Sequence, residues 1–76
     1  MAELLLYVTS GCHLCEAAEV IVQQALGRAV ATVEIADDDI LRERYGLRIP
    51  VLRRADTGVE LDWPFAAEQV QTLLRD

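Results

Sequence analysis

Residues 4–15 read LLLYVTSGCHLC, and they carry the clearest structural signal in the chain. Its first five residues form a continuous apolar run of strand length, which is typical of a strand covered on both faces. Residues 9–11 interrupt the run, and from Cys12 onward the apolar residues take a helical spacing. The sequence therefore predicts a strand over residues 4–8 that is followed at once by a helix, with Cys12 and Cys15 at the junction.

The helix that begins at Cys12 has one apolar face. Its apolar residues are separated by four, three, one and three positions, a spacing that places them on one side of a helix. They are Leu14, Ala18, Ile21, Val22 and Ala25. Gly27 is a natural residue to end this helix, because the position after a helix often takes a left-handed conformation that glycine tolerates.

Two further segments follow in the middle of the chain. Residues 30–35 are typical of a second strand, with alternate apolar residues on one side. The acidic residues 37–39 provide an N-cap and a favourable charge for a short helix that runs through Tyr45 and closes at Gly46.

The last third of the chain predicts a hairpin and a final helix. Pro50 begins a third strand over residues 51–54, and a turn at residues 55–58 leads to a fourth strand over residues 59–61. Pro64 suits the first turn of the last helix. The apolar positions of that helix are Ala67, Val70, Leu73 and Leu74.

The predicted order of elements is therefore β-α-β-α-β-β-α, in one domain that spans residues 1–76. The first three elements form a parallel crossover unit, which is right-handed by rule. The final hairpin must add antiparallel to this unit. The predicted fold class is α/β, with a mixed four-stranded sheet and helices on both of its faces.

The charge of the chain excludes several kinds of partner. The formal net charge is −6, and all seven basic residues are arginines. Nucleic acid is a poor partner because phosphate binding needs a basic face, and an anionic membrane would repel the protein. The only basic pair, Arg53 and Arg54, is interpreted as a solvated strand end. Because lysine is absent, Schiff-base chemistry and a phosphate-binding loop lysine are excluded.

The sequence favours a cytoplasmic protein. Its first residues lack a basic region and carry too short an apolar run for a signal peptide. Nothing approaches the ~20 apolar residues of a membrane span. In a reducing cytoplasm, two cysteines are more often catalytic or metal-binding than structural.

The spacing of Cys12 and Cys15 suits reversible disulfide chemistry. Residues three apart on a helix have Cβ atoms about 5–6 Å apart, which is close to what a disulfide needs. Cys12 is expected at the helix N-terminus, where free N–H groups and the helix dipole favour a thiolate. Cys15 lies one turn inside and should be more shielded. We therefore assign Cys12 as the attacking thiol and Cys15 as the resolving thiol.

The cysteine pair has two other interpretations. A zinc ion needs four ligands, and His13 lies between the cysteines, where it is badly placed to complete the same site. We therefore expect no metal site. Two inert buried cysteines are a second alternative, which the position at a strand–helix junction disfavours. As an imidazolium His13 would stabilise a Cys12 thiolate; alternatively, it is a solvated residue with little effect.

At this point the chain resembles a glutaredoxin over nearly its whole length, and more closely the small bacterial glutaredoxin-like proteins with unassigned substrates. Besides the two cysteines, residues 45–52 (YGLRIPVL) are similar to the glutaredoxin segment that carries the cis-proline of the thioredoxin superfamily. The resemblance implies a thioredoxin/glutaredoxin fold with a cis peptide at Ile49–Pro50 that faces the cysteines. It also implies that Ile49 pairs with a substrate strand.

The chain departs from the glutaredoxin pattern at two places. Glutaredoxins carry a proline and an aromatic residue between the cysteines, where this chain has His13 and Leu14. They also have acidic residues that bind the γ-glutamyl end of glutathione, where this chain has residues 60–65. Here Asp62 either caps the last helix or holds a substrate ammonium group. We expect no resident cofactor, and glutathione stays open as a co-substrate.

Three functions are compatible with these features. The leading hypothesis is a monomeric thiol–disulfide oxidoreductase that acts on a protein disulfide or on a low-molecular-weight disulfide. The second is a dimer that carries an iron–sulfur cluster through Cys12 of each chain. The third is a redox-inactive interaction module on a thioredoxin scaffold, since a fold does not dictate a function.

Overall fold

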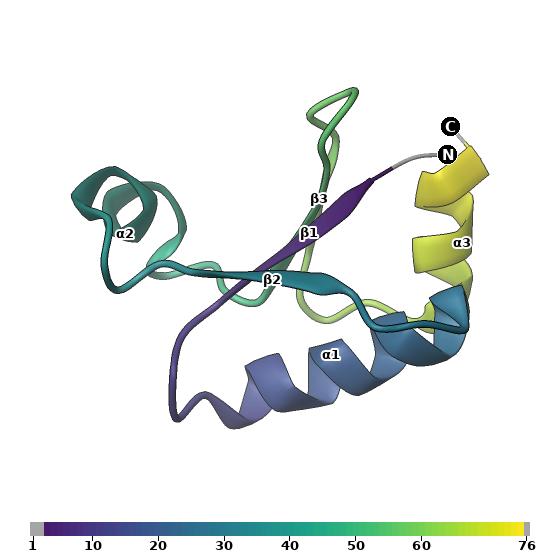
Figure 1. Ribbon diagram of the computed structural model, residues 1–76, viewed down its shortest axis with the longest axis horizontal. Helices are drawn as coiled ribbons and strands as arrows, with labels where there is room; N and C mark the ends of the chain where they lie inside the picture. The colour runs from purple at the N-terminus through teal and green to yellow at the C-terminus, as the bar shows by residue number, and fades with distance from the viewer. Residues whose placement is uncertain (1–2, 76) are drawn as a thin grey trace.

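The structure is a computed structural model that describes residues 3–75. It confirms the predicted order of strands and helices (Figure 1). The elements are β1 (Leu4–Val8), α1 (His13–Leu26), β2 (Ala31–Glu34), α2 (Asp39–Tyr45), β3 (Val51–Arg54), β4 (Glu60–Asp62) and α3 (Ala67–Arg75).

The four strands form one mixed sheet in the order β2-β1-β3-β4. β1 is parallel to β2, with Tyr7 opposite Val33, and antiparallel to β3, with Tyr7 opposite Val51. β4 is antiparallel to β3, with Asp62 opposite Val51. β1, β2 and β4 therefore end, and β3 begins, at the same end of the sheet. We call this the cysteine end, because the chain passes from β1 to Cys12 there.

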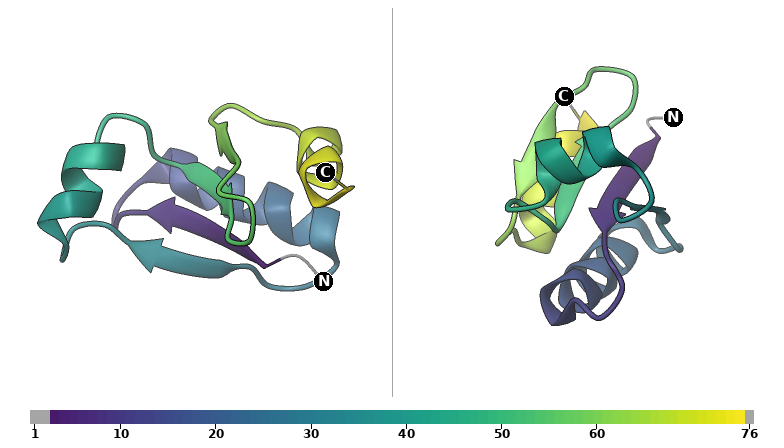
Figure 2. Two further views of the ribbon diagram at one scale, coloured as in Figure 1. Left: turned by 90° about the horizontal axis from the view of Figure 1, so that it is seen from above. Right: turned by 90° about the vertical axis from the view of Figure 1, so that its left-hand side faces the viewer.

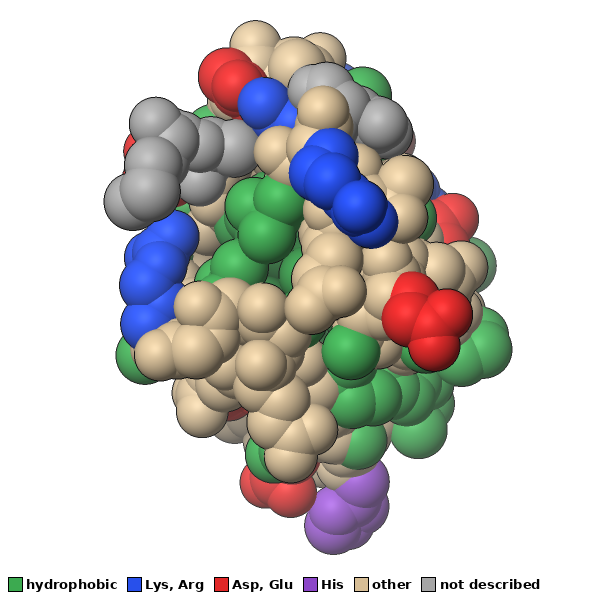
Figure 3. Space-filling model, turned by 90° about the vertical axis from the view of Figure 1, so that its right-hand side faces the viewer, with side chains coloured by type: hydrophobic (Ala, Val, Ile, Leu, Met, Phe, Trp, Pro, Cys, Tyr) green, Lys and Arg blue, Asp and Glu red, His purple; other side chains and the backbone are tan. Residues whose placement is uncertain are grey.

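Helices cover both faces of the sheet, as the sequence predicted. α1 and α3 pack beside each other on one face, whereas α2 lies apart from them at the other (Figures 1 and 2). The first face includes Leu6, Ala18 and Val70 in its core. Partly buried apolar residues surround that core. Figure 3 shows apolar side chains in a hollow on the side of the molecule that carries α3.

The second core, on the α2 face, is smaller and aromatic. Tyr45, the last residue of α2, is fully buried and stacks on Tyr7 of β1 with ring centroids 4.4 Å apart. Ile35 and Val51 complete the buried part of this cluster. The short helix is therefore held to the sheet mainly through its C-terminal residue.

Leu14 is not part of the buried face of α1, so the prediction for this residue was wrong. Its side chain is 54% exposed. The inward positions of the helix are Cys15, Ala18 and Val22, which are separated by three and four residues. Cys15 fills the inward position of the first turn, and Leu14 is left in contact with solvent.

The interpretation of Arg53 and Arg54 as a solvated strand end was also wrong. Both side chains are half-buried. The Nη1 group of Arg54 donates hydrogen bonds to the carbonyl oxygens of Leu73, at 2.8 Å, and Leu74, at 3.2 Å. These carbonyls lie in the last turn of α3, where a helix leaves acceptors unpaired and favours a positive charge. Arg54 thus connects β3 to the end of α3.

Pro64 lies before α3 rather than in its first turn, because the helix begins at Ala67. A glutamine side chain takes the capping role instead: Gln69 Oε1 accepts a hydrogen bond from the Ala66 N–H at 2.7 Å. The Trp63–Pro64 peptide bond is cis, which the sequence analysis did not predict. The rings of Trp63 and Phe65 pack edge to face, with centroids 5.2 Å apart.

Candidate active site

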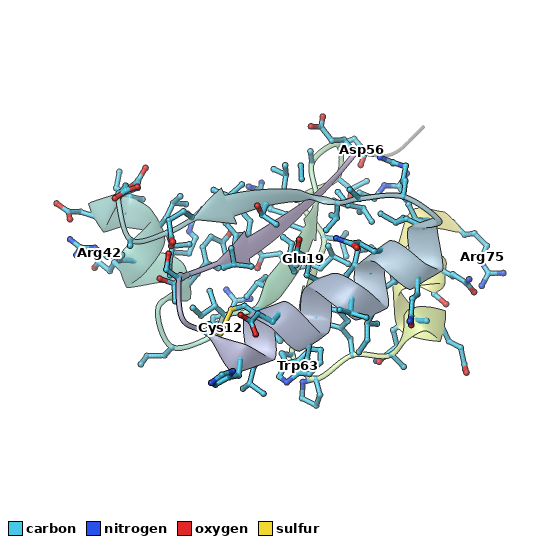
Figure 4. All side chains as sticks on the ribbon, turned by 60° about the horizontal axis from the view of Figure 1, so that its bottom comes forward. Cys12, Glu19, Arg42, Asp56, Trp63 and Arg75 are labelled. Carbon is cyan, nitrogen blue, oxygen red and sulfur yellow. A yellow bond between two sulfur atoms is a disulfide. The ribbon has the colours of Figure 1, made fainter. Side chains whose placement is uncertain are left out.

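Cys12 and Cys15 form a disulfide at the start of α1 (Figure 4). Cys12 is the N-cap residue and has extended backbone angles. Gly11, just before it, has a φ of 75°, in the left-handed region that glycine tolerates best. The Cα atoms of the two cysteines are 5.2 Å apart, which is within the range of about 4.4–6.8 Å for disulfides. The strand–helix junction thus holds the pair at bonding distance.

The two sulfur atoms have different surroundings. Cys15 is 4% exposed and belongs to the inward face of α1, whereas Cys12 is half-buried. The Sγ atom of Cys12 accepts a hydrogen bond from the Cys15 N–H at 3.1 Å. A free N–H group of the first helical turn is therefore directed at the Cys12 sulfur, where it would also stabilise a negative charge. A reagent in solvent reaches Cys12 more easily than Cys15.

His13 points into solvent. Its side chain is 98% exposed, and its Nδ1 atom lies 3.8 Å from Glu16 Oε2. The structure therefore places the imidazole beside a carboxylate of the same helical turn.

The loop that leads to Cys12 is anchored to the neighbouring strand. Glu34 Oε1, at the end of β2, accepts hydrogen bonds from the backbone N–H and the hydroxyl of Ser10, each at 2.9 Å. Glu34 Oε2 also accepts from the Ala36 N–H. These bonds, chiefly those from Ala36 and then Ser10, lower the pKa of Glu34. Sequence analysis missed this anchor, which lies 24 residues away from Ser10.

Ile49 and Pro50 lie at the cysteine end, just before β3. Pro50 is buried, and the Ile49–Pro50 peptide bond is cis. The Ile49 side chain packs at the margin of the aromatic core. Its N–H donates a hydrogen bond to the carbonyl oxygen of Tyr45 at 3.0 Å, and the Arg48 N–H donates to the same oxygen at 2.8 Å. The N–H of Ile49 is therefore already engaged within the protein.

Asp62 does not cap α3. It lies at the end of β4, and its Oδ1 atom accepts a hydrogen bond from Arg48 Nη2 at 2.7 Å. The same nitrogen donates to Glu60 Oε1 at 2.8 Å. Arg48 therefore connects the loop before Pro50 to two carboxylates of the edge strand. The helix-cap alternative for Asp62 was wrong because Gln69 performs that role.

Tyr45 extends this network into the aromatic core. Its hydroxyl donates to Glu60 Oε2 at 2.5 Å, and the Arg48 guanidinium lies 5.3 Å from its ring centroid. Burial and then the bond to Glu60 raise the pKa of Tyr45. Burial alone would raise the pKa of Glu60, but the hydrogen bonds from Tyr45 and Arg48 outweigh it, so this pKa lies below its ordinary value.

We call the side chains of Tyr45, Arg48, Glu60 and Asp62 the charged network. The sequence analysis missed all of it except Asp62. One signal was present: Glu60 and Asp62 are two residues apart on a strand, so their side chains share a face of the sheet. Nothing in the local pattern showed that Arg48 would lie against that face.

Glu60→Gln should destabilise the protein at neutral pH by about 1–3 kcal/mol, because it removes a charged hydrogen-bond acceptor. The lowered pKa of Glu60 sets the pH dependence. When the pKa of a carboxyl is lower in the folded state, the carboxylate stabilises the fold at pH values above the unfolded-state pKa. That stabilisation is lost as the pH falls through the folded-state pKa. The difference in unfolding free energy between wild type and variant should therefore become smaller at pH values below 4.5, the ordinary pKa of a glutamate. Urea unfolding at pH 7 and at successively lower pH values measures this gap.

The control for that experiment is Glu43→Gln, on an exposed position of α2. It changes the net charge by the same amount and should leave stability nearly unchanged. A gap for Glu60→Gln that stayed constant down to the acid limit would show that the carboxylate form of Glu60 does not contribute.

Neither a metal cluster nor a membrane helix is present in the described part of the chain. Within residues 3–75, no group of three or more His, Cys, Asp or Glu side chains is placed to hold a metal ion. None of the helices in that range is long and apolar enough to cross a membrane.

The fold and the site together define a class of protein. A mixed four-stranded sheet flanked by three helices, with a Cys-x-x-Cys pair at the start of the first helix, is the thioredoxin-like fold. The chain belongs to the glutaredoxin-like domain (DUF836) family, whose model matches residues 3–75. No curated protein matches the chain.

Solved bacterial structures have the same fold. The X-ray structure of target protein XcR50 from X. campestris is 46% identical, with 95% of each chain covered and a TM-score of 0.84. Its solution structure gives 47% identity, 99% coverage of this chain, 94% coverage of that one and a TM-score of 0.82. Protein Ne2328 from Nitrosomonas europaea is 25% identical, with 95% of this chain and 89% of that one covered and a TM-score of 0.72.

Proposed function

We propose that this protein is a thiol–disulfide oxidoreductase that reduces or exchanges disulfides through Cys12 and Cys15. One observation carries the proposal: the two sulfurs are bonded at the start of a helix, with one buried and the other accessible. Membership of the glutaredoxin-like family supports it. The cysteine pair supplies the chemistry, and the proposal needs no group beyond an external thiol reductant.

The proposed reaction has two exchange steps. The Cys12 thiolate attacks one sulfur of a substrate disulfide, which forms a mixed disulfide and releases the other substrate sulfur as a thiolate. The Cys15 thiol then loses its proton and attacks the Cys12 sulfur, which releases the second substrate thiolate. Two electrons pass from the protein dithiol to the substrate. The protein is left with the Cys12–Cys15 disulfide, which a dithiol or glutathione-type reductant in the cytoplasm returns to the dithiol.

Other residues support these steps in the proposal. The Cys15 N–H stabilises the Cys12 thiolate, and His13 modulates it from the exposed side of the helix start when it is protonated. Pro50 and Ile49 form the wall of the substrate site at the cysteine end. Asp62 acts there through its ion pair with Arg48, which holds the segment before Ile49 against β4.

The test is catalysis of protein disulfide reduction. With dithiothreitol as the electron donor, wild-type protein should accelerate the reduction of insulin disulfides well above the rate with dithiothreitol alone. In buffers of graded thiol–disulfide ratio, both cysteines should change state together, as counted by alkylation and mass spectrometry. The matched control is the double variant Cys12→Ser, Cys15→Ser. A wild-type rate equal to that control would refute the proposed function.

A further inference from the structure

We infer that the preferred substrate is a protein disulfide with an apolar, non-acidic residue beside its cysteine, rather than glutathione disulfide. This inference rests on the proposed function and names its substrate class. Three features of the cysteine end carry it: charged groups that are paired within the protein, a backbone donor that is already used, and two exposed leucines.

The charged groups that could hold glutathione are paired with each other. A glutathione site needs a cation for a carboxylate and an anion for the ammonium group. At the cysteine end, the Nη2 atom of Arg48 lies 2.7 Å from Asp62 Oδ1 and 2.8 Å from Glu60 Oε1. Glu60 also accepts from the Tyr45 hydroxyl. Binding the two ends of glutathione here would require these internal bonds to break.

The backbone next to Pro50 offers only half of a strand pairing. An added strand is recognised through main-chain N–H and C=O groups. The Ile49 N–H already donates to the Tyr45 carbonyl at 3.0 Å. A substrate segment at Ile49 therefore cannot use this N–H, so side-chain contacts must supply more of the recognition.

Apolar side chains are exposed at this end. Leu14 lies between the two cysteines and is 54% exposed, and Leu47 lies three residues before Pro50 and is fully exposed. Large exposed apolar side chains beside a reactive group indicate a contact surface. The half-buried Trp63 follows β4 at the same end and packs against the core that includes Ala18 of α1.

Charge also favours a non-acidic partner. The protein has a net charge of −6, and the exposed carboxylate of Glu16 lies one residue after Cys15. Each half of glutathione disulfide carries more carboxylates than ammonium groups, so its approach is opposed by the overall field. A peptide with an apolar residue next to its cysteine meets the leucines without adding negative charge.

The experiment compares disulfide substrates against the reduced protein. The substrates are an uncharged peptide disulfide with leucine beside each cysteine, the same peptide with aspartate in that place, glutathione disulfide and a small aromatic disulfide as the reference. Rate constants come from acid quenching and alkylation. Each rate constant is divided by the rate constant for the small aromatic disulfide. The resulting ratio for wild type should be about tenfold higher with the leucine peptide than with glutathione disulfide or with the aspartate peptide.

Matched variants test the leucines. Leu14→Ser and Leu47→Ser should each lower the preference for the leucine peptide over the aspartate peptide by about three- to tenfold. The controls are Val20→Ser and Ile40→Ser, which change apolar residues that are 53% and 71% exposed elsewhere on α1 and α2. They should leave the preference unchanged. Circular dichroism of all four variants checks that each one folds.

Two outcomes would overturn the inference. If glutathione disulfide reacts as fast as the leucine peptide in wild type, or if the leucine variants behave like the controls, the substrate class is wrong and the proposed function stands. If the protein exchanges with none of the four disulfides, including the small reference, the proposed function fails as well.

Discussion

Cys12→Ser is expected to abolish disulfide exchange, whereas Cys15→Ser is expected to react once and stop. The first variant loses the accessible sulfur, and the remaining thiol lies on the buried side of α1, where Cys15 is 4% exposed. The second keeps the Cys12 nucleophile at the helix N-terminus but has no thiol to resolve the mixed disulfide. Without an external thiol, Cys12→Ser should release no substrate thiol above the uncatalysed rate, and Cys15→Ser should release one equivalent and stop.

Mass spectrometry distinguishes the two losses. After incubation with an excess of peptide disulfide, Cys15→Ser should carry one peptide adduct, which dithiothreitol removes, and Cys12→Ser should carry none. The double serine variant is the blank for non-specific modification. An adduct that forms at Cys15 as fast as at Cys12 would reverse the assigned roles.

Tyr45→Ala should cost about 3–5 kcal/mol of folding free energy, the usual loss for a buried aromatic residue. A chain of this length has a total of about 4–11 kcal/mol to lose. Tyr45 is fully buried, stacks on Tyr7 and donates to Glu60, so three kinds of contact disappear together. The melting temperature should fall by about 12 °C or more.

Tyr45→Phe separates the hydroxyl from the ring. It keeps the stacking and removes only the hydrogen bond to Glu60, so its cost should be about 1.5–3 kcal/mol. Thermal and urea unfolding of both variants measure the two contributions. If Tyr45→Ala cost no more than Tyr45→Phe, the aromatic core would not be what holds α2 to the sheet.

The sequence predicted the order of elements because each one has its own local pattern. The apolar run at residues 4–8, the helical spacing after Cys12 and the glycine at position 27 depend on near neighbours only. The cysteine pair was found for the same reason, since two residues three positions apart, within one helical turn, carry the whole signal. The mixed sheet then followed from rules on connections between strands.

The errors concern side chains whose partners are distant in the chain. The sequence predicts a solvated Arg54, because the carbonyls that it binds lie about twenty residues further on. Leu14 fitted the helical spacing, but Cys15 fills the inward position of the first turn. The role of Arg48 depends on the β3–β4 register, which places the carboxylates of Glu60 and Asp62 within reach of the loop before β3. Such long-range pairings have no local periodicity to reveal them.

The order of strands has a consequence for behaviour at high concentration. The outermost strands are β2 and β4, with four and three residues, and each ends in a carboxylate, Glu34 and Asp62. An open sheet edge is a template for pairing with another chain, and short, charged edges resist it. The longer apolar strand β1 lies between two neighbours, so its backbone is never offered to another molecule in the folded state. The fold therefore protects its most aggregation-prone segment by placing it in the middle of the sheet.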